Sequence, residues 1–293
     1  PFQPLLDLPE WPAFSLRWRG EKVWIGSARS RARSRLPTRE DLQQMLDELV
    51  RAQALCLAPE LGETGINLWA KLAQNLGKPV FVRLPSTSQL PHRLKPSSWH
   101  CKRALDGLVA AGLAIALFPL CLGLAIAIRW TSPGSIFFQQ WRVGKRGKLF
   151  RIVKFRTMIV NAERSHHQVM GNQNGLHKRD DDPRVTPIGR WMRKYSLDEL
   201  PQLINVLRGE MSLVGPRPWA LYDALRLEGK NRRRLNALPG ITGAWQVRGR
   251  SHLLALDAAT QIDLHYLRCW SIGEDLRILL LTVPKVLSGF GAY

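Results

Sequence analysis

Cysteine is scarce in this sequence, and what there is does not cluster. The four cysteines are Cys56, Cys101, Cys121 and Cys269. No two of them form a Cys-x-x-Cys pair, and the seven histidines show no spacing typical of a zinc motif. A zinc site and a disulfide framework are therefore not indicated, and we expect reduced thiols in a cytosolic environment.

Acidic residues are also few, since 23 Asp and Glu face 43 Lys and Arg and leave a formal net charge of +20. Such a charge favours polyanionic partners, namely nucleic acid, an anionic membrane surface or phosphorylated substrates. The composition of 45% apolar, 23% charged and 8% aromatic residues is that of an ordered protein. It excludes a wholly disordered chain, a collagen and a polytopic transporter.

Long apolar runs are absent except for one, the 22 uncharged residues 107–128. That length matches the hydrocarbon core of a bilayer. However, Pro119 lies in the middle, where it removes a backbone hydrogen bond, and Lys102, Arg103 and Arg129 place positive charge at both ends. We expect a re-entrant membrane helix that bends at Pro119 and returns to the face it entered. A buried core helix is the alternative.

The region before this run is predicted to be a small α/β unit. Helix-like segments at 39–53 and 67–76 are each followed by a strand-like segment, at 55–58 and 80–84. The domains we expect are an N-terminal α/β region (1–84), a Ser- and Pro-rich linker (85–100), the re-entrant helix (101–130) and a loop-rich α/β catalytic domain (131–293). Because the chain starts at Pro1 and residues 1–10 lack a secretory signal, we also expect a truncated or processed N-terminus.

The segment Ser196-Leu-Asp198-Glu199-Leu-Pro201 carries the most suggestive carboxylates. Its Ser-x-x-Glu spacing is that of a helix-capping box. Pro201, however, disfavours a helix that starts at Ser196, so we expect the helix to begin at or after Asp198. A carboxylate there can serve as a metal ligand, a base or a nucleophile. Capping and catalysis both remain open from spacing alone.

Five cations are candidates for phosphate binding. Lys154 and Arg156 share one face of a predicted strand that starts at Phe150, and Arg217 is held between Pro216 and Pro218. Arg248 and Arg250 follow the segment AWQV, which we expect to be a short strand between tight loops. A solvent-facing strand edge and a plain rigid turn are the alternatives.

Two segments are predicted to form amphipathic helices. In 187–195 the apolar residues Ile188, Trp191, Met192 and Tyr195 recur at helical spacing, and 276–290 is mostly apolar with Arg277 and Lys285. Either helix fits the plane of a membrane surface, and either fits a protein core.

Several motifs resemble, in order, those of the bacterial sugar transferase family, the monotopic polyprenyl-phosphate glycosyl-1-phosphate transferases that initiate exopolysaccharide and glycan assembly. They are KRALDG, the apolar run with its proline, FFQQWRVGKRGKLFRIVKFRTM, DPRVTPIGRWMRKYSLDELPQLINVLRGEMSLVGPRPW, PGITGAWQVRGR and DLHYLRCWS. The resemblance covers residues 102–293, about two thirds of the chain.

The resemblance implies an activity and its partners. Members transfer a sugar 1-phosphate from a UDP-sugar to a polyprenyl phosphate such as undecaprenyl phosphate, with Mg²⁺ and through a covalent intermediate. On this chain Asp198 would be the nucleophile and Glu199 the acid/base or metal ligand, while Lys154, Arg156 and Arg217 would neutralise phosphate charge. The location implied is the cytoplasmic face of the bacterial inner membrane, beside anionic lipids and without nucleic acid; a homo-oligomer is compatible.

Two positions depart from the family's pattern. Phe118 precedes Pro119 where the family often has Ser, which removes a hydroxyl that would satisfy freed backbone groups. Glu210 stands where the family usually has Asp, which would alter the geometry if that residue touches metal. The alternative function is a membrane-tethered basic nucleic-acid-binding protein or a scaffold, although no recognition helix or zinc finger is evident.

Overall fold

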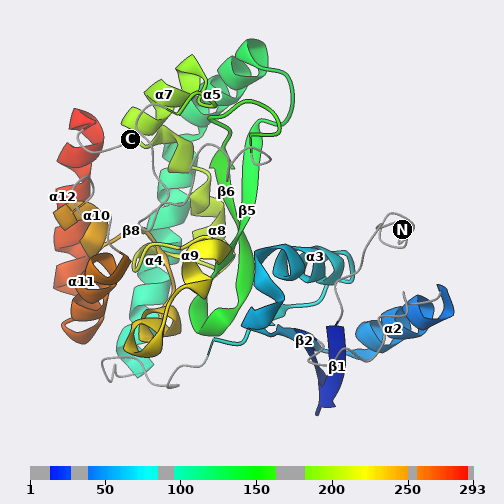
Figure 1. Ribbon diagram of the computed structural model, residues 1–293. Helices are drawn as coiled ribbons and strands as arrows, with labels where there is room; N and C mark the ends of the chain where they lie inside the picture. Colours follow the sequence, from blue (N-terminus) through cyan, green and yellow to red (C-terminus); the bar gives the residue numbers. More distant parts are fainter. Residues whose placement is uncertain (1–13, 28–38, 85–95, 163–181, 250–255, 290–293) are drawn as a thin grey trace.

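The computed structural model describes residues 14–27, 39–84, 96–162, 182–249 and 256–289, and within them the chain is a mixed α/β structure (Figure 1). The strands are β1 (Phe14–Arg19), β2 (Lys22–Ser27), β3 (Ala54–Leu57), β4 (Val80–Val82), β5 (Phe137–Val143), β6 (Leu149–Phe155), β7 (Ser212–Val214) and β8 (Gly240–Thr242). The α-helices are α2 (Arg39–Arg51), α3 (Gly62–Asn75), α4 (Pro96–Ala116), α5 (Phe118–Thr131), α7 (Pro187–Lys194), α8 (Gln202–Leu207), α9 (Leu221–Leu225), α10 (Ala244–Gly249), α11 (Leu256–Arg268) and α12 (Ile272–Ser288). Short 3₁₀ helices are η1 (Pro59–Leu61), η2 (Lys145–Gly147), η3 (Leu197–Glu199) and η4 (Gly229–Asn236).

The N-terminal region forms a four-stranded sheet in the order β1-β2-β3-β4. β3 and β4 confirm the two strands predicted at 55–58 and 80–84, and the structure pairs β2, β3 and β4 in parallel. The sequence analysis missed β2 and the antiparallel edge strand β1. Residues 85–95 of the expected linker lie outside the described residues. The rest of that linker is helical, because α4 already begins at Pro96.

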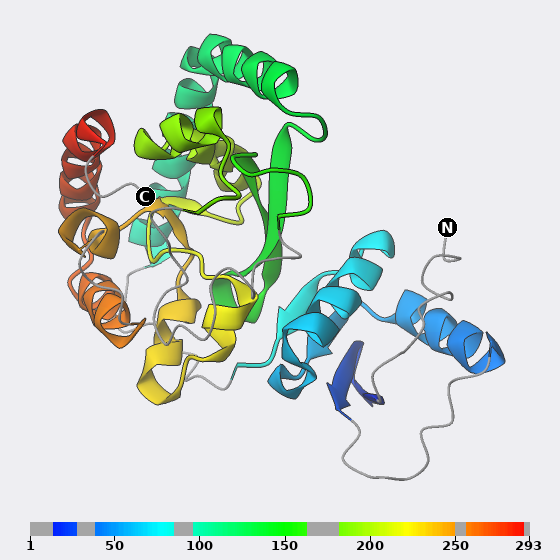
Figure 2. The same ribbon diagram turned by 45° about the horizontal axis from the view of Figure 1, so that its top comes forward.

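A long hairpin, β5–β6, connects the N-terminal sheet with the rest of the molecule. Phe81 of β4 pairs with Lys148 at the tip of the hairpin, beside Gly147. Gly147 has a φ of +79°, and a Cβ there would lie 2.3 Å from the carbonyl oxygen of Val82. Only glycine fits so close a backbone approach. The apolar core of the sheet continues into Trp219 and Leu221. The tip of the hairpin lies beside the N-terminal sheet (Figure 2).

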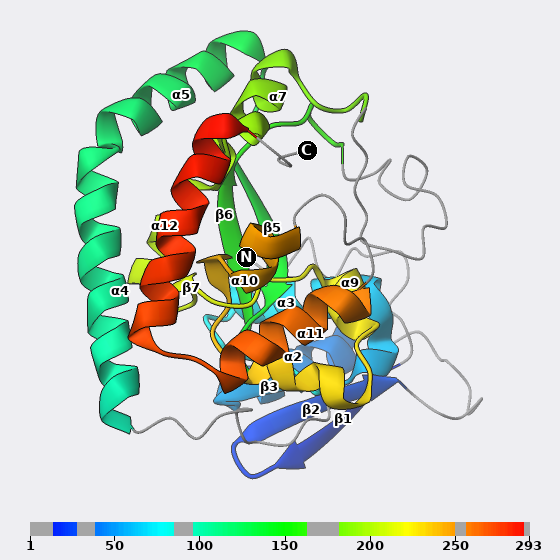
Figure 3. The same cartoon turned by 90° about the vertical axis from the view of Figure 1, so that its left-hand side faces the viewer.

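Helices α4 and α5 form a bent pair with an angle of 60° between them, shown in Figure 3. Among the described residues no single helix meets the length and hydropathy expected of a membrane span, whereas this pair meets them together. The break falls at Leu117, so Pro119 lies in the first turn of α5, where its missing N–H costs little. A bend is present, as expected, and it lies two residues before Pro119. It forms although Phe118, and not Ser, precedes the proline.

One face of the α4–α5 pair packs on the protein through Ala110, Leu124 and Ile128, which are buried. The opposite face is apolar and exposed. Its large side chains are Leu105, Leu108, Val109, Leu113, Ile115, Phe118, Leu120, Leu122, Ile126 and Trp130. An apolar surface of this extent is typical of a membrane or protein contact.

Both predicted amphipathic helices form, as α7 and α12. Each helix agrees in part with both alternatives, a helix on a membrane surface and a helix packed into the protein core. α7 buries Met192 and leaves Trp191 exposed, while α12 buries Ile278 and exposes Leu276, Leu280 and other apolar residues.

The prediction of a strand for AWQV is wrong, because these residues begin helix α10. Ala244 and Val247 both pack into the core, at the i, i+3 spacing of a helix. Strand β8 lies just before them, and the turn at Gly243 is close-packed: a Cβ there would lie 2.1 Å from the carbonyl oxygen of Gly215. Four residues are too few for periodicity to separate the two structures.

Candidate active site

Asp198 and Glu199 lie together on η3, against strand β6. The Lys154 ammonium donates to Glu199 Oε1 at 2.7 Å and lies 3.9 Å from Asp198 Oδ2. The Arg217 guanidinium lies 3.6 Å from the same Glu199 oxygen. The structure thus brings together four of the residues singled out from the sequence, two carboxylates and two cations.

The local chain at the dyad is a tight turn. Ser196 has a left-handed backbone, with φ of +53°, and its side chain makes no capping hydrogen bond. The capping box suggested by Ser-x-x-Glu is therefore absent. Pro201 precedes the first residue of α8, so the helix begins after the dyad, as expected, and Asp198 and Glu199 occupy the turn before it.

Asn205 fixes this turn relative to the hairpin. Its Oδ1 accepts from the Val153 amide at 3.0 Å, and its Nδ2 donates to the Arg151 carbonyl at 2.8 Å and to Glu210 Oε2 at 2.6 Å. The side chain is fully buried. Asn205 thereby holds α8, and the dyad before it, in register with Lys154 on β6. The signal in the sequence was a lone amide within the apolar run LINVL.

The loop that carries Arg217 is held by backbone packing. A Cβ on Gly240 would lie 2.1 Å from the Gly215 nitrogen, so the GPRP and PGITG segments meet backbone to backbone. The Arg217 carbonyl accepts from Arg234, which is itself ion-paired with buried Asp263. The side chain of Arg217 remains one third exposed, which leaves it free to meet a ligand.

The electrostatics of the site shift the pKa of Asp198 upward. Burial raises the pKa of Asp198 above its ordinary value, and the charge of Lys154 opposes this rise more than any other group. Glu199 adds to the rise, while Arg193 and Arg217 oppose it. Positive charge added beside such a carboxyl group lowers its pKa and favours the carboxylate.

The remaining predicted cations lie elsewhere. Arg156 donates to the carbonyls of Ser132 and Pro133 at the end of α5. Arg248 pairs with Glu274 at 3.3 Å on the surface. Arg250 lies outside the described residues. A role in phosphate binding stays a prediction for these three, and the contacts described for Arg156 are structural.

Two further arginines near the dyad were missed. Arg193 of α7 donates to the Thr157 hydroxyl at 2.9 Å, and burial lowers its pKa. Arg142 of β5 has buried Nε and Nη1 atoms that find no hydrogen-bond partner. Alternation along FFQQWRV places Arg142 on the same strand face as Phe138, the partner of Lys154 in the hairpin, which was a usable signal.

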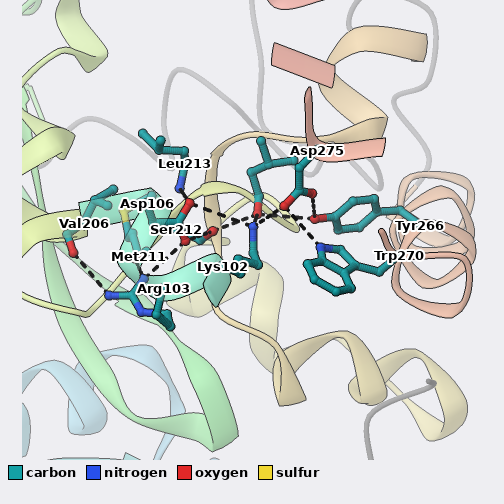
Figure 4. Close-up of polar contacts among 11 residues, drawn as sticks. Lys102, Arg103, Asp106, Val206, Met211, Ser212, Leu213, Tyr266, Trp270 and Asp275 are labelled. Carbon is teal, nitrogen blue, oxygen red and sulfur yellow. Dashed lines mark hydrogen bonds and ion pairs between the residues drawn. The ribbon is translucent and has the colours of Figure 1, made fainter. Parts of the chain in front are cut away.

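The KRALDG motif serves the scaffold rather than the site (Figure 4). The Lys102 ammonium donates to Asp275 Oδ2 at 2.5 Å, and Asp275 also accepts from Tyr266 at 2.6 Å and Trp270 at 3.2 Å. Asp106 accepts from the Ser212 hydroxyl at 2.7 Å. We call these side chains the Lys102 network. It ties α4 to β7 and α12.

A family model described as bacterial sugar transferase matches residues 97–289 of the chain. Galactosyl transferase CpsE of Streptococcus agalactiae is 38% identical over 242 residues, which are 78% of this chain and 52% of that protein. Exopolysaccharide production protein ExoY of Sinorhizobium fredii is 40% identical over 210 residues, 68% of this chain and 91% of that protein.

The UDP-glucose:undecaprenyl-phosphate glucose-1-phosphate transferase of Caulobacter vibrioides is 45% identical over 201 residues, 66% of this chain and 72% of that protein. The chain spans about half the length of CpsE and nearly all of ExoY. The match of the family model covers the bent helix pair, the dyad and the helices up to α12. This chain therefore belongs to the bacterial sugar transferase family.

Proposed function

We propose that this protein transfers a sugar 1-phosphate from a UDP-sugar to undecaprenyl phosphate or a related polyprenyl phosphate, and releases UMP. The observation that carries the proposal is the buried Asp198, next to Glu199 and within reach of Lys154, in a member of this family. Among its relatives, the Caulobacter protein is named for UDP-glucose and undecaprenyl phosphate.

In the first step, an Asp198 carboxylate oxygen attacks the sugar-bearing phosphorus of the donor. A phosphorus–oxygen bond to Asp198 forms, the bond from that phosphorus to the bridging oxygen breaks, and UMP leaves with the electron pair. Lys154 and Arg217 face the dyad at 2.7 Å and 3.6 Å from Glu199, so they are placed to neutralise the phosphates. Without such charge, the anionic nucleophile and the anionic donor repel each other.

In the second step, an oxygen of the polyprenyl phosphate attacks the same phosphorus. The bond to Asp198 breaks, which regenerates the carboxylate and yields a polyprenyl diphosphosugar. Asn205 maintains the position of Asp198 through both steps, since it pins the turn that bears the dyad. The overall reaction exchanges one phosphoanhydride bond for another and needs no oxidant or reductant.

The donor set fits Mg²⁺. Mg²⁺ is commonly held by one or two carboxylates together with substrate phosphates and waters. Among the described residues no group of three or more His, Cys, Asp or Glu comes together, so Asp198 and Glu199 would hold the ion jointly with the donor. When bound, Mg²⁺ would supply positive charge to the phosphate oxygens.

We further propose that α4 and α5 enter the bilayer from the cytoplasmic face and return to it, next to anionic lipids. Both ends of the pair are tied to one folded body, because Lys102 pairs with Asp275 and Arg156 holds the carbonyls after α5. A straight crossing would separate these contacts. The exposed apolar face of the pair would then meet lipid tails.

The test uses protein purified in detergent, with UDP-sugar and Mg²⁺ but no lipid. Intact-mass measurement should show one phosphosugar added, and UMP should appear in equal amount. Asp198→Asn should show neither, while the exposed Asp47→Asn, in the N-terminal region, should behave as wild type. Lipid-linked product from wild type without any donor-only adduct would refute the covalent step, and full turnover by Asp198→Asn would refute the assigned nucleophile.

A further inference from the structure

The side chain of Arg142 is in a costly state in the free protein. Its Nε and Nη1 atoms are buried and have no hydrogen-bond partner. Buried N–H groups that make no hydrogen bond are disfavoured, so natural proteins pair such groups or use them. Asp223, on α9, also has a buried Oδ1 without a hydrogen bond. Burial raises its pKa to about 6, although Arg142 is the strongest opposing charge.

The register of the hairpin places Arg142 on the face of the dyad. Phe138 pairs with Lys154, Gln140 with Ile152 and Arg142 with Phe150. Side chains of cross-strand partners and of every second residue share a face, so Arg142 and Lys154 lie on the same one. They are four residues apart along the strand, which corresponds to about 13 Å.

Arg142 also adjoins the Arg217 loop. Its backbone pairs with Ala220, three residues after Arg217, and the neighbouring Val143 amide donates to the Trp219 carbonyl. The long side chains of Lys154, Arg217 and Arg142 thus border one stretch of the same surface. The distance of about 13 Å between the Lys154 and Arg142 positions suits a diphosphate with its nucleoside better than a single phosphate.

The two ends of the hairpin face different parts of the molecule. β6 ends at Phe155, and Arg156 contacts the end of α5, so the Lys154 end faces the bent helix pair (Figure 1). The Arg142 end lies toward the N-terminal sheet, which meets the hairpin tip at Lys148 (Figure 2). A lipid phosphate would reach Asp198 from the α5 end, so the nucleotide would extend in the opposite direction.

We propose that Arg142 binds the phosphate of the departing nucleotide, the α-phosphate of the nucleoside diphosphate donor. This rests on the proposed function. The guanidinium would donate to that phosphate when the donor is bound, and to the bridging oxygen as its bond to the sugar-bearing phosphorus breaks. The bound donor would satisfy the nitrogens that have no partner in the free protein.

The experiment compares wild type, Arg142→Met and Arg142→Lys. Thermal unfolding in detergent with Mg²⁺ is followed as UDP is added, and KM is measured separately for the UDP-sugar and for undecaprenyl phosphate. Arg142→Met should unfold at the same temperature as wild type or higher without nucleotide, because two buried nitrogens that make no hydrogen bond have been removed. Its apparent Kd for UDP and KM for UDP-sugar should rise about tenfold to a hundredfold. Arg142→Lys should recover part of the loss.

Arg151→Met is the matched control, since Arg151 lies on the opposite face of the same hairpin, across from Trp141. It should bind UDP as wild type does. If Arg142→Met unfolded earlier yet kept wild-type affinity for UDP, Arg142 would be structural and the proposal would be overturned. The same holds if only the KM for the lipid phosphate rose. Should Arg142→Met not fold, unchanged UDP affinity in Arg142→Lys decides against the proposal. A wild type that binds UDP but releases no UMP would refute the proposed function alone.

Discussion

The Lys102 network and the dyad site are two clusters of charge in the same protein, and they differ in how completely their groups are paired. In the Lys102 network, Asp275 accepts three hydrogen bonds from Lys102, Tyr266 and Trp270. At the dyad, Lys154 meets both carboxylates, Arg217 stays one third exposed, and the nearby Arg142 has two buried nitrogens without a partner. Both clusters are largely shielded from water.

The difference separates scaffold from site. A polar cluster whose groups satisfy one another stabilises a single arrangement and has little left to offer a ligand. A cluster with excess cations is less stable on its own and is stabilised when an anion binds to it. The net charge of +20 therefore matters less than where the unpaired part of it lies.

The largest effect is expected from breaking the satisfied cluster. Asp275→Asn would remove the nearer counter-charge of the buried Lys102 ammonium and leave it only Asp106, at 3.9 Å, so the free energy of unfolding should fall by about 3 kcal/mol. Denaturant unfolding in detergent measures it. Glu274→Gln is the control on the preceding residue, because Glu274 pairs with exposed Arg248 and should change stability by less than about 1 kcal/mol. Equal effects for the two variants would contradict the comparison.

A second change tests the contact between scaffold and site. Asn205→Ala removes three hydrogen bonds that join α8 to β6 and Glu210. We expect stability to fall by about 1 to 3 kcal/mol, and kcat to fall about tenfold with little change in KM for the donor, because the dyad would lose its register with Lys154. Thr260→Val removes a buried hydroxyl that bonds the Leu256 carbonyl on α11, and it should cost stability without changing kcat.

The sequence predicted the elements whose signal is local. Asp198 and Glu199, Lys154, the bend at Pro119 and the amphipathic helices α7 and α12 follow from spacing, proline chemistry and family motifs. Partners of long side chains were not predictable in this way. Alternation placed Lys154 and Arg156 on one face, but the carbonyls that Arg156 binds come from Ser132 and Pro133, more than twenty residues away. Whether Arg142 finds a partner is likewise decided by tertiary packing.

The pH dependence of two buried aspartates should have opposite signs. Burial raises the pKa of Asp198, so its ionisation disfavours the fold, and this cost appears as pH rises from the unfolded value through the folded one. Hydrogen bonds from Arg184 lower the pKa of Asp182, so its contribution is present above the unfolded value and is lost as pH falls through the folded one. Asp198→Asn should therefore stabilise the protein at neutral pH, whereas Asp182→Asn should destabilise it.

Unfolding temperatures measured from about pH 2 to 8 test both signs, because the contribution of Asp182 is lost below the ordinary pKa of an aspartate and the cost of Asp198 appears above it. The rate of donor-only adduct formation should also fall as pH drops through the raised pKa of Asp198, because the attacking carboxylate must be ionised. An acid limb at the ordinary value for an aspartate, together with a destabilised Asp198→Asn, would mean that the dyad is as well satisfied as the Lys102 network.

The smallest effect is expected from Glu210→Asp, which introduces the residue usual in the family. Glu210 Oε2 accepts a hydrogen bond from Asn205 Nδ2 at 2.6 Å. The shorter side chain would weaken that bond, so we expect about 1 kcal/mol of lost stability and a kcat within about twofold of wild type. The apparent affinity for Mg²⁺, from the dependence of UMP release on Mg²⁺ concentration, should not change. A shift in that affinity with unchanged stability would place Glu210 at the metal rather than behind Asn205, and would move it from the satisfied group to the ligand-binding one.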